Sequence, residues 1–135
     1  MPAIANITIL DNQEVPINHT FVPVSSVPAK YRDTKNGLPT VGQRYISVNA
    51  KIAERGGLNK VTVTLGIPVL KTVGASNAQG FVPGPEVSYE NKASLTFFLP
   101  SQGTDEERGE LLTMVKNALA HSQISSVITS LQPAY

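Results

Sequence analysis

The sequence contains no cysteine and no tryptophan, and only two of its 135 residues are histidine. Without cysteine there is no disulfide, no thiolate nucleophile and no metal site that uses cysteine ligands. Four tyrosines and four phenylalanines are its only aromatic residues, so the core has to be aliphatic. Eleven Lys and Arg against ten Asp and Glu give a net charge of +1, which is not the balance of a wholly basic nucleic-acid-binding domain. Any anion binding must therefore come from a local face.

Targeting signals and membrane spans are also missing. The N-terminal stretch MPAIANITIL has no basic region and no long apolar run, so a signal peptide is not predicted. No stretch approaches the about 20 apolar residues of a transmembrane helix. We therefore expect a soluble protein that stays where it is made and has no membrane partner. The length predicts one domain, residues 1–135.

The inventory of catalytic chemistry is poor. The sequence has no H-E-x-x-H, G-x-S-x-G or Walker A motif. His19 lies in an edge-strand pattern and His121 near a helix end, and we interpret both as structural rather than metal-binding or catalytic. The acidic run from Asp105 to Glu107 is explained by the favourable position of carboxylates at a helix start. The sequence thus predicts no enzyme, no cofactor and no metal.

Two helices are predicted over about residues 104–132. Thr104 and Glu107 have the spacing of a capping box, Ser122 is the predicted N-cap of the second helix, and Pro133 ends it. Apolar residues recur at helical spacing from 111 to 119 and again from 124 to 131. Two short amphipathic helices cannot bury both stripes on each other alone, so they require a sheet or a partner subunit.

Strand patterns fill the chain before the helices, which predicts an α+β fold. An N-terminal hairpin is expected at about 5–24, at a sheet edge because Pro16 and Pro23 disfavour a central strand. The remaining antiparallel sheet is expected at about 27–99, with strands at 27–33, 43–54, 60–67 and 87–99. We expect a break at Pro68, with 69–71 either extending the strand or beginning another. A Gly- and Pro-rich loop is expected over Val73–Glu86.

Alternation of apolar and polar residues gives the strands expected at 43–54 and 60–67 one apolar face and one polar face each. Apolar residues, such as Ile46 and Val63, recur at every second position of both strands. The polar positions between them are Tyr45, Ser47, Asn49, Lys51, Thr62 and Thr64. Arg44, Arg55 and Lys60 are either solvated charges or the rim of this polar face.

Several stretches together resemble the coat proteins of single-stranded RNA bacteriophages, the levivirus group, and most closely its Q-beta-like branch. The segment TDEER at Thr104–Arg108 and the ending L-x-P-A-Y at Leu131–Tyr135 are similar to that branch almost letter for letter. The opening ANITILDN and the pair QRYISVNAKI and NKVTVTLGIP have the spacing and alternation of the family's strands. The resemblance covers essentially the whole chain.

This resemblance implies an N-terminal β-hairpin, a five-stranded antiparallel sheet and two C-terminal α-helices. It implies an obligate, interlocked homodimer with one ten-stranded sheet, in which the helices of one subunit lie across the sheet of the other. Dimers would build an icosahedral T=3 shell around the single-stranded RNA genome. The protein would be found in the virion, and in the host cytoplasm during assembly. The loop Val73–Glu86 would gather around the symmetry axes.

The resemblance also implies an RNA site on the inner sheet face. There the family binds an operator hairpin, represses replicase translation and marks the genome for packaging. The positions carried over from the family are Ser47, Asn49, Lys51, Thr62, Thr64, Tyr89 and Asn91, with Tyr89 stacking on a base. Three features depart from the family's pattern: Thr64 stands where some relatives have lysine, Gly66 replaces a polar residue, and the branch's disulfides between loops cannot form without cysteine.

A second interpretation remains open from the residues alone. The chain could be a small soluble ligand-binding α+β domain, with the Gly- and Pro-rich loop as a lid. An enzyme has less support than either. Size-exclusion chromatography separates the interpretations, because only a coat protein would elute as very large particles that carry nucleic acid.

Overall fold

The computed structural model describes residues 3–34, 40–71 and 86–133. Its elements are β1 (Ile7–Leu10), β2 (Asn18–Ser26), β3 (Ala29–Asp33), the 3-10 turn η1 (Thr40–Gly42), β4 (Tyr45–Lys51), β5 (Leu58–Leu70), β6 (Val87–Pro100), α1 (Asp105–Ala120) and α2 (Ser122–Ser130). The chain divides into two compact units, Met1–Ile52 with Asn59–Phe98, and Ala53–Leu58 with Leu99–Tyr135. The single domain over residues 1–135 stays a prediction. The expected loop Val73–Glu86 lies, except for Glu86, outside the described residues.

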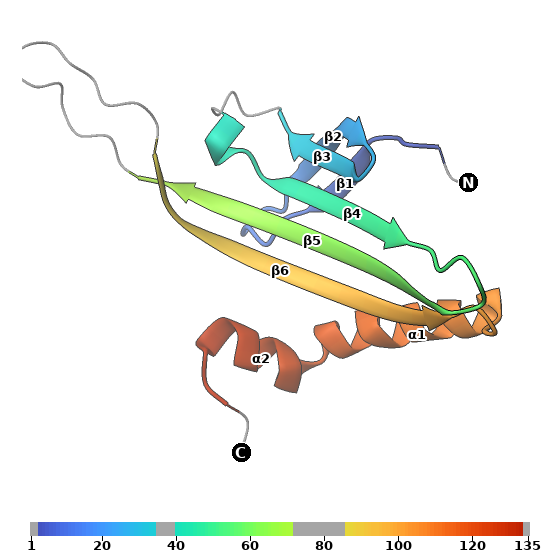
Figure 1. The fold of residues 1–135 in the computed structure, drawn as a ribbon. Coiled ribbons are helices and arrows are strands. Elements are labelled where there is room, and N and C mark those ends of the chain that lie inside the picture. Colours follow the sequence, from blue (N-terminus) through green and yellow to red (C-terminus); the bar gives the residue numbers. More distant parts are fainter. Residues whose placement is uncertain (1–2, 35–39, 72–85, 134–135) are drawn as a thin grey trace, which may run out of the picture. The chain divides into compact units, whose positions relative to one another are not determined.

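All six strands form one sheet whose spatial order follows the sequence, from β1 to β6 (Figure 1). The pairs from β1–β2 through β4–β5 are antiparallel. The N-terminal hairpin is therefore continuous with the rest of the sheet. The predicted α+β class, an antiparallel sheet followed by two C-terminal helices, is confirmed.

Two predictions that rest on prolines, the edge position of the second strand and the break at Pro68, are partly wrong. β2 is not an edge strand along its whole length, because it pairs with both β1 and β3. Its pairing with β1 ends at Phe21, however, so from Pro23 onward β2 pairs only with β3, and the register shifts between Pro23 and Ser25. A residue without an N–H is tolerated there. Pro68 does not break β5, whose pairing with β4 ends at Gly66 before that proline is reached.

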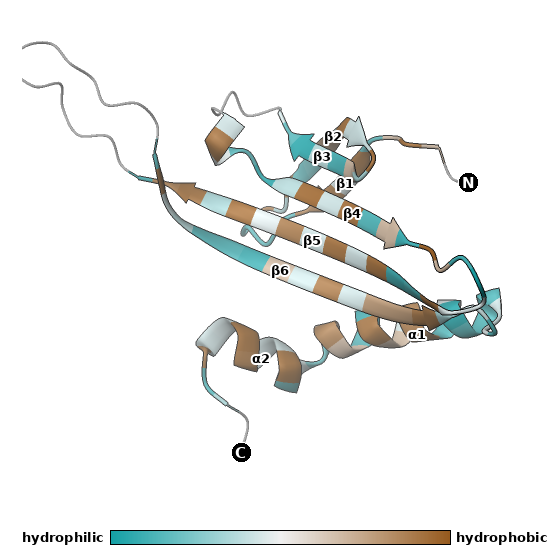
Figure 2. Cartoon of the chain, in the orientation of Figure 1, coloured by the Kyte–Doolittle hydropathy of each residue, from teal (hydrophilic) through white to brown (hydrophobic). Residues whose placement is uncertain are grey.

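The core of the sheet unit is small. Phe21, Tyr31 and Ile46 are the buried hydrophobic residues of the described chain, with Phe21 only 3% exposed. Half-buried aliphatic residues, including Val48 and Val63, pack against this cluster. Apolar and polar residues alternate along β4 and β5, as Figure 2 shows, so the predicted separation of faces on these strands is confirmed.

The helical unit begins with the predicted capping box. The Thr104 hydroxyl accepts a hydrogen bond from the backbone N–H of Glu107 at 3.2 Å, and the Glu107 carboxylate accepts one from the backbone N–H of Thr104 at 3.3 Å. The prediction that Ser122 caps the second helix is wrong by one residue. His121 is the cap, because its ring Nδ1 accepts the backbone N–H of Gln123 at 3.3 Å. No residue of α1 or α2 is buried.

His19 joins the N-terminal hairpin to β3 through two carboxylates. Its Nε2 lies 2.7 Å from the Asp11 carboxylate and its Nδ1 lies 2.7 Å from the Asp33 carboxylate. The hydrogen bond to Asp11, and then the one to Asp33, raises the pKa of His19, although burial and Arg44 oppose this. With both ring nitrogens protonated, Nε2–H faces Asp11, so Arg44, 3.1 Å from Nε2, acts there as a second cation and not as a donor. Two cations thus balance two carboxylates, and the structural interpretation of His19 gains a physical basis.

This network makes the stability of the sheet pH-dependent. The pKa of His19 is raised above its usual 6.5, so the stabilisation is complete below that pH and is lost as pH rises through the raised pKa. The pKa of Asp11 is lowered from 3.8, chiefly by the backbone N–H of Ile17 and then by His19, so its contribution is lost only as pH falls below that value. We expect the urea midpoint to decrease as the pH rises from 6.5 through the raised pKa of His19, and to decrease less in His19→Gln. Equal slopes in the two proteins, or an NMR titration of His19 at its usual pKa, would contradict the account.

Candidate nucleic-acid interface

Five of the seven predicted site residues lie together on one face of β4 and β5. Cross-strand pairing sets Ser47 opposite Thr64 and Asn49 opposite Thr62. Lys51 pairs with Lys60, which the sequence had placed only at the possible rim of this face. Directly opposite residues share a face of a sheet, so hydroxyl, amide and ammonium groups alternate across the two strands. We call this surface, together with its continuation on the neighbouring strands, the polar face.

β3 and β6 extend the polar face in both directions. Lys30 is paired with Ser47 and Arg32 with Tyr45, which puts both β3 cations on it. From β6, Glu90 accepts a hydrogen bond from the hydroxyl of Tyr45, and Lys92 lines the same depression as Tyr45. Phe98 also lies on this side, because the Lys60 ammonium is 6.0 Å from the centre of its ring.

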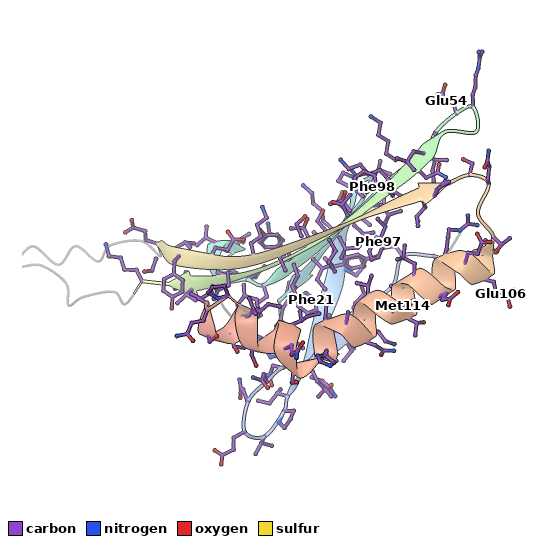
Figure 3. All side chains as sticks on the ribbon, turned by 90° about the horizontal axis from the view of Figure 1, so that it is seen from below. Phe21, Glu54, Phe97, Phe98, Glu106 and Met114 are labelled. Atoms are coloured by element: carbon purple, nitrogen blue, oxygen red, sulfur yellow. The ribbon has the colours of Figure 1, made fainter. Side chains whose placement is uncertain are left out.

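The structure places Tyr89 and Asn91 on the opposite face. Successive side chains of a strand point to opposite sides, and the contacts above assign the even-numbered residues of β6 to the polar face. Figure 3 shows the alternation at Phe97 and Phe98, which point to opposite sides of β6. The prediction that Tyr89 and Asn91 share a face with Ser47 is therefore wrong, and Glu90 and Lys92 occupy the neighbouring positions on the polar face.

Cationic side chains are concentrated on the polar face. Among the described residues of β3 to β6, it carries one carboxylate, Glu90, and the five cations Lys30, Arg32, Lys51, Lys60 and Lys92. The chain as a whole has a net charge of only +1. Arg44, which the sequence also placed at the possible rim of the polar face, lies beside His19 on the opposite face of the sheet. The net charge of the whole chain therefore does not reveal the local excess of positive charge on this face.

A depression of about 300 Å³ lies on the polar face, around the start of β4. It is lined by Lys30, Tyr31, Arg32, Tyr45, Ile46, Ser47, Thr64 and Lys92. The hydrogen bond to Glu90, followed by burial, raises the pKa of Tyr45 above its usual value of 10.0. The Tyr45 hydroxyl therefore keeps its proton at neutral pH and donates it to Glu90. The depression combines hydroxyls and cations with an aromatic ring, a set of groups that suits phosphates and bases.

Among the described residues, no group of three or more His, Asp or Glu side chains is placed to hold a metal ion. No helix within the described ranges is long and apolar enough to cross a membrane.

Solved structures of bacteriophage particles share this architecture. The chain is 30% identical to the protein of the virus-like particle of bacteriophage ESE058, with a TM-score of 0.90 over 99% of this chain and 100% of the other. The virus-like particle of bacteriophage NT-214 gives 27% identity and a TM-score of 0.84, over 99% and 100%. The capsid protein of bacteriophage GA, at 17% identity and a TM-score of 0.76 over 96% of both chains, shows the fold alone. A search of curated protein sequences found no match.

A sheet of six strands with two C-terminal helices, seen also in these particles, defines a viral coat protein, which is a structural protein and not an enzyme. The chain belongs to the levivirus coat protein family, whose model matches residues 2–135. This membership confirms the resemblance drawn from the TDEER segment and the strand patterns. It also decides against the alternative of a ligand-binding domain.

Proposed function

We propose that the chain forms an obligate homodimer whose two sheets join into one of ten strands, and that these dimers assemble into an icosahedral T=3 shell around single-stranded RNA. The structures of the ESE058 and NT-214 relatives are of virus-like particles, which supports assembly. In this proposal the protein is a component of the virion and passes through the host cytoplasm during assembly.

Exposed apolar residues on the helices support the dimer. Leu111 and Leu119 of α1 are 41% and 43% exposed, and Ile128 of α2 is 59% exposed. Helices this short are marginal in water unless an apolar face is packed against something. In the interlocked dimer, the sheet of the second subunit provides that surface.

The polar face supports RNA binding, and its five cations are the single observation that carries this part of the proposal. Lysine and arginine contacts to phosphate position an RNA, while hydroxyl and amide groups read the edges of unpaired bases. We assign these roles to the cations and to Ser47, Asn49, Thr62 and Thr64. The ligand is an operator hairpin of the genome, and its binding represses replicase translation and selects the RNA for packaging.

Single lysine replacements on the polar face test this proposal. Lys51→Ala and Lys92→Ala should each weaken binding to any RNA, because each removes about one phosphate contact. The slope of log affinity against log salt concentration should fall by about 0.7 per contact, the value for single strands. Filter binding over a salt series measures both quantities.

The matched control is Lys116→Ala, which removes the same charge from the exposed surface of α1. Its affinity and salt slope should equal those of the unmodified protein. If all three variants behave alike, the RNA does not lie on the polar face, and only the shell-forming part of the proposal survives.

A further inference from the structure

The polar face contains an aromatic ring, Tyr45, that is not among the RNA-binding positions implied by the family resemblance. Tyr45 stands at the start of β4 and is paired with Gly66 of β5. The hydroxyl of Tyr45 donates to Glu90 of β6. One side chain therefore crosses β5 and ties β4 to β6.

Gly66 makes this crossing possible. A Cβ built on Gly66 would lie 2.3 Å from Cζ of Tyr45 and 2.4 Å from its Cε1, distances that no side chain can share with the ring. It would also lie 2.5 Å from the Glu90 carboxylate. The ring therefore occupies the space that a side chain at position 66 would fill. Glycine is required here for the close approach of the Tyr45 ring to the strand.

Two charged neighbours contact the ring and hold it in place. The Arg32 guanidinium lies 5.9 Å from the centre of the ring, within the range of a cation–π contact. Glu90 fixes the hydroxyl end, which gives a physical role to the one carboxylate on an otherwise basic face. Tyr45 also lines the depression of about 300 Å³, next to Ser47, Thr64 and Lys92.

We propose that Tyr45 is the aromatic platform on which an unpaired base of the RNA stacks, held in position by Gly66 and Glu90. This inference rests on the proposed RNA-binding function and names the residue that distinguishes a base from a bare sugar-phosphate chain. Lys30 and Lys92, which line the same depression, hold the flanking phosphates. The Tyr89 ring, on the other face of β6, has no part in this contact.

The test compares two probes, a short oligouridylate and an abasic ribose-phosphate chain of the same length, each bound to the full-length protein. Tyr45→Leu should bind the oligouridylate about tenfold to a hundredfold more weakly, the usual effect of losing a base–aromatic stack. Its affinity for the abasic chain should not change. Tyr45→Phe, which keeps the ring but loses the hydrogen bond to Glu90, should retain most of the base-dependent affinity.

Two further variants separate stacking from folding. Tyr89→Leu removes an equally sized ring from the opposite face and should leave both affinities unchanged. Gly66→Ala leaves Tyr45 intact but displaces its ring, and should therefore lower only the affinity for the oligouridylate.

The outcomes distinguish this inference from the function on which it rests. Lys92→Ala should weaken binding of both probes, and a failure there overturns the proposed RNA face itself. If Lys92→Ala behaves as expected while Tyr45→Leu matches Tyr89→Leu, the RNA face stands and the platform is overturned. An equal loss for both probes in Tyr45→Leu also overturns it, because the effect then does not depend on a base.

Discussion

Leu119→Asp is expected to abolish the dimer, and every particle with it. Leu119 belongs to the apolar stripe of α1, and in the single chain it is 43% exposed. In the proposed dimer the partner's sheet covers this stripe, so the aspartate would become a buried charge without a partner. Such a charge costs several kcal/mol, which is comparable to much of the stability of a small protein.

The control for this variant is Asn117→Asp, two residues earlier on the opposite side of the same helix. It introduces the same charge at almost the same distance from the helix end, at an exposed position. Light scattering should detect particles for Asn117→Asp and none for Leu119→Asp. A soluble and fully folded monomer of Leu119→Asp would falsify the obligate dimer.

Phe21→Ala should be the most destabilising single truncation in the sheet. Phe21 is 3% exposed and is one of only three buried apolar residues in the described chain. Truncating a buried phenylalanine to alanine costs roughly 3–5 kcal/mol, because transfer free energy is lost and a cavity remains. A small core leaves few other residues to compensate.

The neighbouring position provides a matched control for the core. Val22 pairs with Arg32 on the polar face and is 37% exposed, so Val22→Ala should cost much less. Urea unfolding of both variants at one protein concentration measures the difference, since the stability of a dimer depends on concentration. Similar losses in the two variants would show that Phe21 is not the centre of the core.

The faces of β4 and β5 could be predicted because their alternation is uninterrupted. Ile46 lies in the apolar row of β4 and Ser47 in its polar row. Each residue pairs with a β5 residue of the same kind, Leu65 and Thr64. The start of α1 could be predicted for a similar reason, since a capping box is a local contact between Thr104 and Glu107. Contacts that depend on a few neighbouring residues are visible in the sequence.

The prediction that Tyr89 and Asn91 lie on the polar face is wrong because it rests on the similarity of the S-Y-E-N segment to the family and not on the alternation of apolar residues along β6. Ala93, Leu95, Phe97 and Leu99 form an apolar row, and this row places Lys92 on the polar face. That signal was present in the sequence and would have moved Tyr89 to the other side.

Other contacts could not be predicted because they join distant positions. His19 meets carboxylates that are 8 and 14 residues away, and Tyr45 meets Glu90 across 45 residues. No local pattern links these pairs, and only the register of the sheet brings them together. The space left by Gly66 likewise has meaning only when its cross-strand partner is known.

The central claim is that dimers of this chain build a shell around RNA, and the size of the purified protein tests it most directly. Size-exclusion chromatography with light scattering and absorbance at two wavelengths measures mass and nucleic-acid content together, and negative-stain images show the form of the particles. The account predicts megadalton, icosahedral particles that contain RNA. A monomer or small oligomer free of nucleic acid would contradict it.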